Sequence, residues 1–363
     1  MPDTDRTDAL LEQIRQALAE QQTLLPCGNG SKVFFGRLVL GAALCCSEHR
    51  GILQYEPNEL VLTARSGTPL QEVVAALAER GQMLAFEPPH FSPDATLGGA
   101  VATGLAGPAR AYHGSVRDFV LGMRIINGLG QPLRFGGQVM KNVAGYDISR
   151  LLVGSLGTLA LILDISLKVL PLPDKEITLC QSCDSATAWQ QMLAWSRQSL
   201  PITATAWYRG RLYCRLAGEG SAVQAAVRLV GGEENPDGNT FWTALREQTL
   251  PAFTSSQRLW RLSLPATTPL RHESGELILE WGGALRWCCE QETSQVDASD
   301  YWNYAQTCGG HACCFRGAQP GSEVFQPLPA GLLALQQRLK QAFDPKHLFN
   351  PGRMYGPDST PEL

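Results

Sequence analysis

The spacing of apolar residues along the chain predicts a mixed α+β protein. A helical period over residues 8–20 places one apolar face on a short amphipathic helix. Two strands are expected near residues 51–56 and 59–65, where short apolar runs end at polar turns. After them, the tetrapeptide "TPLQ" from Thr68 to Gln71 has the pattern of a capping box, with Pro at the first helical position, and predicts a second helix.

Residues 88–115, "PPHFSPDATLGGAVATGLAGPARAYHGS", interrupt this regularity because they hold little that would pack as a regular core element. We expect a long functional loop there, since small residues let a ligand approach the backbone. A hairpin follows, turning through Gly128 and Gly130. The segment "YDISRLLVGSLGTLALILDISLKVLP" then predicts a short helix, a glycine turn and a long strand. Its apolar residues alternate with polar ones, which predicts one buried and one solvent-facing side; the polar positions are Asp164, Ser166 and Lys168.

The composition of the chain changes after Pro173, and all eight Trp residues lie at position 189 or later. A strand, a helix, a hairpin and another helix are expected in turn, near residues 175–182, from 185, around Arg209-Gly210 and near 221–230. This order fits an antiparallel sheet with helices on one face. We therefore expect a first domain, a smaller α+β cap domain and a C-terminal helix and loop that return to the first domain, over residues 1–173, 174–325 and 326–363.

Composition and charge exclude several classes of protein. The 363 residues are 44% hydrophobic and 18% charged, which is typical of a soluble globular protein of about two domains. A net charge of −4 leaves no basic surface of the kind that binds nucleic acid. No signal-peptide h-region and no apolar run of membrane-spanning length is present, which predicts a cytoplasmic protein. Eleven cysteines in that setting indicate reduced thiols, and three adjacent pairs look like small buried hydrophobes: Cys45-Cys46, Cys288-Cys289 and Cys313-Cys314.

Three glycine-rich segments, residues 28–30, 98–107 and 154–157, are candidates for binding chemistry. Each alone is as readily a plain turn. Together they offer unhindered backbone N–H groups, which form anion-binding nests. The first, "PCGNGSK", completes neither the dinucleotide fingerprint, which needs Gly at Val33, nor the P-loop. Two such loops can clamp a pyrophosphate from both sides.

Taken as an ordered set, these segments resemble the PCMH-type FAD-binding fold of the vanillyl-alcohol-oxidase family. "PCGNGSK" falls at that family's first pyrophosphate loop, and the run from Gly98 to Asp118 resembles its second flavin loop. "KNVAGYDISRLLVGSLGTLALILDISLKVLPLP" resembles the end of the FAD domain, and "FDPKHLFNPGRMY" resembles the C-terminal return to the flavin. The resemblance implies a two-lobed domain with non-covalent FAD, because the first loop lacks the His and the second loop lacks the Cys to which some members attach flavin.

The resemblance implies cofactor contacts in four parts of the chain. The first loop contributes Cys27, Gly28, Asn29, Gly30, Ser31 and Lys32. The second region contributes Pro88, Thr96, Leu97, Gly98, Gly99, Thr103, Gly104 and Gly107, followed by Gly114, Ser115 and Asp118. The remaining contacts are Gly154, Gly157, Ile162 and Asn350. Without the resemblance, Asn350 before Pro351 would indicate only a turn.

Two further stretches, "ELILEWGGALRW" and "GGHACCFRG", resemble the middle domain of the smaller FAD-binding subunits of bacterial glycolate oxidases. That resemblance implies oxidation of glycolate to glyoxylate by hydride transfer to flavin. It also implies a homologous catalytic flavoprotein subunit and an iron–sulfur subunit as partners, with the inner membrane reached only through them.

Two departures from the catalytic relatives leave alternatives open. Leu156 stands where those relatives have an acidic residue. Their Gly-Asp-Gly-Asn-x-His motif is missing, and Gly309-Gly310-His311 is the nearest feature. The chain is therefore a subunit of a glycolate dehydrogenase complex, a stand-alone D-2-hydroxy-acid dehydrogenase, or an assembly subunit whose flavin is structural.

No catalytic residue is assigned from the sequence, but three are candidates. His311 is either a proton acceptor near the flavin or a structural His in a glycine turn. Arg286 and Arg316 either bind a substrate carboxylate bidentately or are ordinary surface or interface arginines. Cys308, His311 and Cys313 have metal-binding side chains without a fourth ligand, so no metal is expected.

Overall fold

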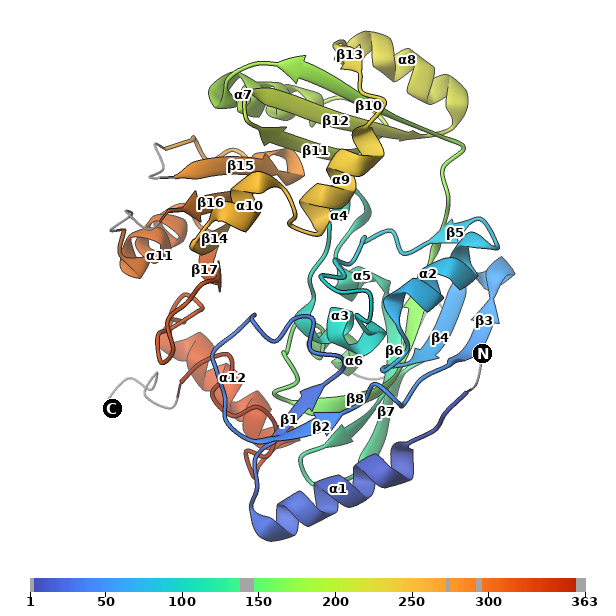
Figure 1. Cartoon of the computed structure of the whole chain (residues 1–363), viewed down its shortest axis with the longest axis vertical. Coiled ribbons are helices and arrows are strands. Elements are labelled where there is room, and N and C mark those ends of the chain that lie inside the picture. The colour runs from blue at the N-terminus through green and yellow to red at the C-terminus, as the bar shows by residue number, and fades with distance from the viewer. Residues whose placement is uncertain (1–2, 138–146, 272–274, 292–295, 357–363) are drawn as a thin grey trace.

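A computed structural model describes residues 3–137, 147–271, 275–291 and 296–356 and arranges them around two large sheets (Figure 1). One is a five-stranded antiparallel sheet in the order β3-β4-β8-β6-β7. The other is an eight-stranded antiparallel sheet in the order β13-β10-β12-β11-β15-β16-β14-β17. Helices pack on both, so the α+β fold class predicted from the sequence is confirmed. Residues 141–146, "KNVAGY", begin the segment that resembles the end of the FAD domain, and they lie outside the described residues.

The first half of the chain forms the five-stranded sheet and the elements around it. Its strands are β1 (Leu24–Cys27), β2 (Ala42–Cys45), β3 (Ile52–Glu56), β4 (Val61–Arg65), β5 (Gln82–Met83), β6 (Val120–Asn127), β7 (Pro132–Gly136), β8 (Ala160–Lys168) and β9 (Leu170–Pro171). Its helices are α1 (Thr7–Glu20), η1 (Pro57–Glu59), α2 (Leu70–Ala78), α3 (Leu97–Thr103), α4 (Arg110–His113), α5 (Val116–Phe119) and α6 (Ile148–Leu151). Strands β1 and β2 pair in parallel beside this sheet. The amphipathic helix, the first two strands of the sheet and the hairpin lie where they were predicted.

The second half forms the eight-stranded sheet, above the first in Figure 1. Its strands are β10 (Lys175–Ser182), β11 (Ile202–Tyr208), β12 (Arg211–Gly218), β13 (Glu233–Glu234), β14 (Arg258–Ser263), β15 (Glu276–Glu280), β16 (Leu285–Glu290) and β17 (His311–Arg316). Its helices are α7 (Ser185–Trp195), α8 (Gly220–Val230), α9 (Gly238–Arg246), α10 (Pro251–Ser255), η2 (Trp281–Gly283) and α11 (Ala298–Thr307). The predicted order of strand, helix, hairpin and helix is confirmed in β10 to α8.

The C-terminal segment runs back to the first half through helix α12 (Ala330–Phe343). Lys340 fixes this return, because its ammonium donates to the carbonyls of Thr158 and Phe349 at 2.6 and 2.7 Å. A β-bridge then joins Phe349 to Leu24 at the start of β1. Within the described residues, no helix has both the length and the apolar character needed to cross a membrane.

The predicted capping box at the start of α2 is wrong. Pro69 is the N-cap residue, and no side chain caps the helix. The Thr68 hydroxyl instead accepts from the Gly51 amide at 3.0 Å and donates to the Gly51 carbonyl at 3.2 Å. Thr68 therefore ties the turn after β4 to the segment before β3, a contact between distant parts of the chain that the local sequence does not announce.

The expectation of an irregular loop over residues 88–115 is also wrong in part. Helix α3 lies within it, and its Leu97, Ala100 and Val101 are fully buried. The small residues serve close packing: a Cβ added at Gly98 would come within 2.8 Å of the Ser66 carbonyl oxygen. Glycine here lets a helix approach the end of β4.

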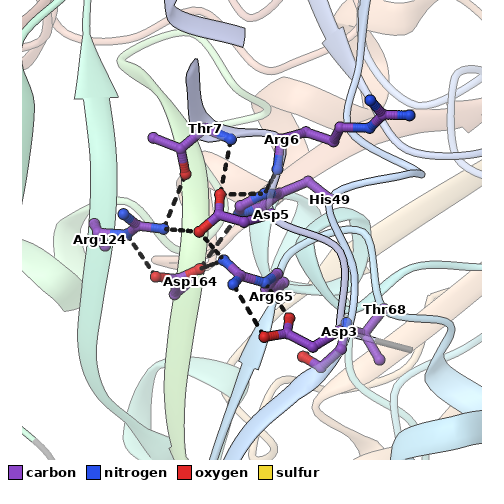
Figure 2. A network of polar contacts seen from close by, with 10 residues as sticks. Asp3, Asp5, Arg6, Thr7, His49, Arg65, Thr68, Arg124 and Asp164 are labelled. Carbon is purple, nitrogen blue, oxygen red and sulfur yellow. Dashed lines mark hydrogen bonds and ion pairs between the residues drawn. The ribbon is translucent and has the colours of Figure 1, made fainter. Parts of the chain in front are cut away.

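The predicted solvent-facing side of β8 is buried. Asp164 and Ser166 are only 4% and 7% exposed. Figure 2 shows the reason for Asp164, which lies in a network of charged side chains from several segments. His49, Arg65 and Arg124 lie beside it, and Asp3 and Asp5 of the N-terminal segment pair with the two arginines. Asp164 accepts from Arg124 Nε at 2.5 Å and lies 3.3 Å from His49 Nε2. A strand covered on its polar side by a distant segment looks half-exposed when only its own periodicity is considered.

The same network fastens the N-terminus. Arg65 Nε donates to Asp3 at 2.7 Å, and Arg65 Nη1 lies 2.9 Å from Asp5 (Figure 2). Arg65 is 6% exposed and His49 is fully buried. The residues before α1 are therefore held against β4 and β8 by buried charges. We call this group the N-terminal charge network: Asp3, Asp5, His49, Arg65, Arg124 and Asp164.

Candidate functional site

A cavity of about 420 Å³ lies between the loop after β1 and helix α3. The turn before β8 and the C-terminal segment complete its wall. We call it the first cavity. It brings together most of the predicted cofactor residues: Cys27, Gly28, Asn29, Gly30, Ser31, Lys32, Thr96, Gly98, Gly99, Thr103, Gly157, Ile162 and Asn350.

The two glycine loops on either side of this cavity touch one another. A Cβ added at Gly28 would overlap the hydroxyl of Thr96, which caps α3 by accepting from the Gly99 amide at 3.2 Å. Asn29 Nδ2 donates to the Asp94 carbonyl at 2.9 Å. The loops are thus held together where backbone N–H groups can meet an anion from both sides.

The charge of the first cavity suits an anionic group. Lys32 is 6% exposed, and burial lowers its pKa to about 8 although Glu247 opposes the shift. Its ammonium donates to Ser31 Oγ and to the His90 carbonyl, both at 3.2 Å, which leaves one of its three protons for a ligand. Arg353 also lines the wall, and none of the lining residues is Asp or Glu.

Two buried polar atoms on this wall lack a hydrogen-bond partner among the residues that the structure describes. They are Ser66 Oγ and Asn350 Oδ1, on side chains that are 3% and 2% exposed. Buried polar groups are nearly always satisfied, so unpaired ones on a cavity wall indicate a polar ligand. Asn350 is further held at a φ of 42°, with its Nδ2 donating to the Leu156 carbonyl. Ser66 was missed by the sequence reasoning, since a lone Ser in a turn carries no distinguishing pattern.

A second cavity of about 450 Å³ adjoins the first and shares Thr103 and Leu156 with it. It lies between the two halves of the chain, since residues from both line it, and it includes the predicted Gly154. Its charged and titratable lining residues are Arg261, His311, Cys313 and Tyr355. The adjoining cavities therefore offer room for a ligand among the glycine loops and against the eight-stranded sheet.

His311 stands at the start of β17 on the wall of the second cavity. The side chain is exposed at the mouth of the cavity, but partial desolvation lowers the pKa of its imidazole, and the positive charges of Arg261 and Arg110 lower it further. The side chain is neutral near pH 7, which is the state that accepts a proton. Arg261 lies opposite Cys313 in the β14–β17 pair and was missed by the sequence reasoning, which singled out other arginines.

Neither predicted arginine lines the first or the second cavity. Arg286 is 1% exposed, and its guanidinium donates to the carbonyls of Thr268 and Pro269. Arg316 donates to Gln248 Oε1 at 2.7 Å and lies over the Phe34 ring. The contacts of both arginines support a structural role.

Several other predicted cofactor residues line neither cavity. Leu97 belongs to the core, the Gly107 carbonyl accepts from Trp281 Nε1, and Ser115 with Asp118 forms the capping box of α5. The full set outside both cavities is Pro88, Leu97, Gly104, Gly107, Gly114, Ser115 and Asp118. Their contact with a cofactor stays a prediction.

All eleven cysteines are free thiols. The expectation that the adjacent pairs are buried is wrong for Cys45, which is exposed. It lies opposite Cys27 in the β1–β2 pair, and burial raises the pKa of the Cys27 thiol to about 11. The Cys27 side chain on the cavity wall is therefore an uncharged thiol.

Comparison with known proteins agrees with this geometry. A family model for an FAD binding domain matches residues 4–136. The glycolate oxidase subunit GlcE of Escherichia coli (strain K12) is 48% identical over 351 residues, which covers 97% of this chain and 98% of that protein. The glycolate oxidase subunit GlcD of Bacillus subtilis (strain 168) is 29% identical over 175 residues, 47% of this chain and 37% of that protein.

Among solved structures, an alkyldihydroxyacetonephosphate synthase superposes with a TM-score of 0.66 at 16% identity. The match covers 96% of this chain and 75% of that one. At this identity the likeness concerns the fold alone, and it extends over both sheets of the chain.

Proposed function

The chain belongs to the family of the glycolate oxidase subunit GlcE, whose members are FAD-dependent oxidoreductases, and from this premise we propose that it is the FAD-binding subunit of a complex that oxidises glycolate to glyoxylate. The observation that carries the proposal is the pair of adjoining cavities, with glycine loops on the wall of one and His311 on the wall of the other. Residues 1–173 and 326–363 would hold the cofactor, and residues 174–325 would cap it.

The residues of the first cavity fit the diphosphate of FAD. Lys32 and Arg353 supply positive charge without a carboxylate on the wall, and Ser66 and Asn350 present unpaired polar atoms. The glycines of both loops would leave their N–H groups open to phosphate oxygens. No covalent link is required by these contacts, so we propose that FAD is bound non-covalently.

The second cavity would receive the substrate. When bound, FAD supplies the acceptor for the hydride that glycolate loses as it becomes glyoxylate. His311 would take the hydroxyl proton at its unprotonated ring nitrogen, because its lowered pKa keeps it neutral at pH 7. The apolar residues around it, including Phe35 and Phe325, would exclude water from the reacting carbon. An iron–sulfur subunit would then carry the electrons away.

Two alternatives differ from this proposal in what the isolated chain can do. A stand-alone D-2-hydroxy-acid dehydrogenase would turn over with an artificial electron acceptor and no partner. An assembly subunit with a structural flavin would support full activity of the complex after its own flavin binding is abolished. Leu156, in place of an acidic residue, lies on the wall of both cavities and favours dependence on a partner subunit.

The test begins with the full chain titrated with FAD, followed by co-expression with its partner subunits and a count of flavin per complex. We expect one FAD per copy of this chain, and glycolate oxidation that requires the partners. Full chain with no flavin absorbance and no FAD uptake would refute the proposal. Turnover by the isolated, FAD-loaded chain would favour the stand-alone dehydrogenase.

A further inference from the structure

Two arginines from different halves of the chain stack on the same indole ring at the second cavity. Arg261 on β14 has its guanidinium 5.2 Å from the centre of the Trp281 ring. Arg110 on α4 lies 4.6 Å from the same centre. Trp281 is 4% exposed, and its Nε1 donates to the Gly107 carbonyl at 3.0 Å, so the ring is fixed between the two halves. The indole thus holds both cations in place.

Neither arginine has a direct counter-ion within the described residues. In the part of the chain that the structure describes, neither forms a hydrogen bond or an ion pair through its guanidinium, and only the stacking contacts are present. Burial lowers the pKa of both guanidinium groups, and the charge of Arg261 lowers the pKa of Arg110 further. Two cations without a direct counter-ion beside a cavity attract an anion.

Two carboxyls act on these arginines from beyond ion-pair distance, Asp118 on Arg110 and Glu280 on Arg261. Asp118 accepts from the amide and the hydroxyl of Ser115 at 2.7 and 2.8 Å. Glu280 is 4% exposed, and its Oε1 accepts from Trp287 Nε1 at 2.6 Å instead of pairing with a guanidinium. Within the described residues, neither carboxyl is therefore a direct counter-ion for its arginine.

Arg261 faces the cavity that would receive the substrate. It lies on one face of the sheet with Cys313, which is its partner across the β14–β17 pair, and His311 follows two residues away on the same face. Arg261, His311 and Cys313 all line the second cavity. A cation and a neutral proton acceptor on one wall match the two ends of a short 2-hydroxy acid.

We propose that Arg261, with the charge of Arg110 behind the shared Trp281 ring, binds the carboxylate of the 2-hydroxy acid and so selects acids over neutral alcohols. The inference rests on the proposed function and adds the residue that recognises the substrate. A guanidinium offers a carboxylate two parallel N–H donors, and its fork fixes the orientation of the acid. The carboxylate would then lie at Arg261 while the hydroxyl points to His311.

The test is a titration of the FAD-loaded full chain with oxalate, a two-carbon dicarboxylate that carries no hydrogen to be removed. Binding is followed by the change in the visible absorbance of the flavin, so activity is not needed. We expect saturable binding by the wild type and a dissociation constant about 10- to 100-fold higher for Arg261→Gln, as loss of a charge-assisted hydrogen bond predicts. Arg261→Lys should lose less affinity than Arg261→Gln, because the charge remains although the two parallel N–H donors are lost.

Arg316→Gln is the matched control, because Arg316 lies on the same sheet and also stacks on an aromatic ring, that of Phe34, but lines neither cavity. We expect Arg316→Gln to bind oxalate with the affinity of the wild type. All three variants should bind FAD with the affinity of the wild type. Equal oxalate affinity in Arg261→Gln, an equal loss in Arg316→Gln, or a wild type that does not bind oxalate would overturn the inference. A chain that fails to bind FAD at all would instead refute the proposed function, so the two failures are distinguishable.

Discussion

Gly28 and Gly30 in the first loop meet different constraints. A Cβ at Gly28 would overlap the Thr96 hydroxyl that caps α3, whereas a Cβ at Gly30 would meet only Val33 Cγ1 at 3.7 Å. Gly30 is constrained by its φ of 77°, which side chains adopt with strain. Steric contact between the loops therefore depends on Gly28, and backbone shape depends on Gly30.

We expect Gly28→Ala to raise the dissociation constant for FAD by about tenfold or more, because the two loops must separate and the Thr96 cap is lost at a cost of about 1 kcal/mol. A bulky residue at Gly30 should also weaken binding, through backbone strain. Quenching of flavin fluorescence on titration measures both. Cys27→Ser is the control, since it replaces one uncharged side chain by another of similar size, and its affinity should match the wild type. Equal FAD affinities for Gly28→Ala and Cys27→Ser would contradict the binding of the diphosphate between the two glycine loops.

Lys32 makes FAD affinity depend on pH. Burial lowers the pKa of its ammonium to about 8 in the cofactor-free protein, and a bound diphosphate favours the protonated form. Affinity should therefore be constant well below pH 8 and fall as the pH rises through that value, by at most about tenfold per pH unit. Lys32→Met should bind more weakly at pH 6.5 and lose this decline. FAD titrations from pH 6.5 to 9.5 would decide, and parallel profiles for the two proteins would exclude Lys32 as a phosphate ligand.

At the scale of elements, the N-terminal charge network fastens the segment before α1 to the five-stranded sheet (Figure 2). We expect Asp164→Asn to lower the free energy of unfolding by about 3–5 kcal/mol, because Arg65 and Arg124 would lose a buried counter-charge. Urea unfolding measures the loss. Glu48→Gln removes the exposed Arg6–Glu48 pair and should change the free energy by less than about 1 kcal/mol.

The pH dependence of stability follows from the same carboxylate. Burial alone would raise the pKa of Asp164, but hydrogen bonds from His49 and Arg124 and their charges lower it overall. A carboxyl whose pKa is lowered by folding stabilises the protein above its ordinary pKa, and that contribution is lost as the pH falls through the folded value. Asp164→Asn should therefore unfold with a flatter acid limb than the wild type. Identical acid limbs would show that the network does not stabilise the fold.

Elements whose own residues determine their burial were predictable from the sequence, and β10, α7 and the β11–β12 hairpin lie where local patterns placed them. Helix α3 and the polar side of β8 were not, because contacts with distant segments decide their burial. The same distinction applies to the site. The first glycine loop carries its signal in consecutive residues, whereas Ser66 and Arg261 gain their surroundings only after folding and have no local pattern.

At the scale of the molecule, polar contacts join the two halves around the cavities. Arg215 on β12 is 6% exposed and lies 2.7 Å from Glu87 of the first half. Tyr112 and Thr205 share a hydrogen bond of 2.8 Å across the same boundary. Because all eight Trp residues lie at 189 or later, tryptophan fluorescence reports on the second half while far-UV circular dichroism reports on both.

We expect the fluorescence and circular dichroism of the wild type to change in one common unfolding transition. In Arg215→Met the two transitions should separate, because the variant leaves Glu87 without its buried cation. Thermal or urea unfolding recorded with both probes gives the comparison. Arg209→Gln serves as the control, since its pair with Glu276 is exposed and lies within the second half. Coincident transitions in Arg215→Met would mean that apolar packing alone couples the halves.

The C-terminal return has a consequence for how the protein is made. Arg353 donates to the Val33 carbonyl across 320 residues of sequence, and Asn350 closes the same cavity. A ribosome that adds about 5–20 residues per second needs roughly 15–60 s to pass from one side of that contact to the other. During this interval the first glycine loop and helix α3 exist without the C-terminal part of the cavity wall. The complete wall of the flavin cavity therefore forms only at the end of synthesis.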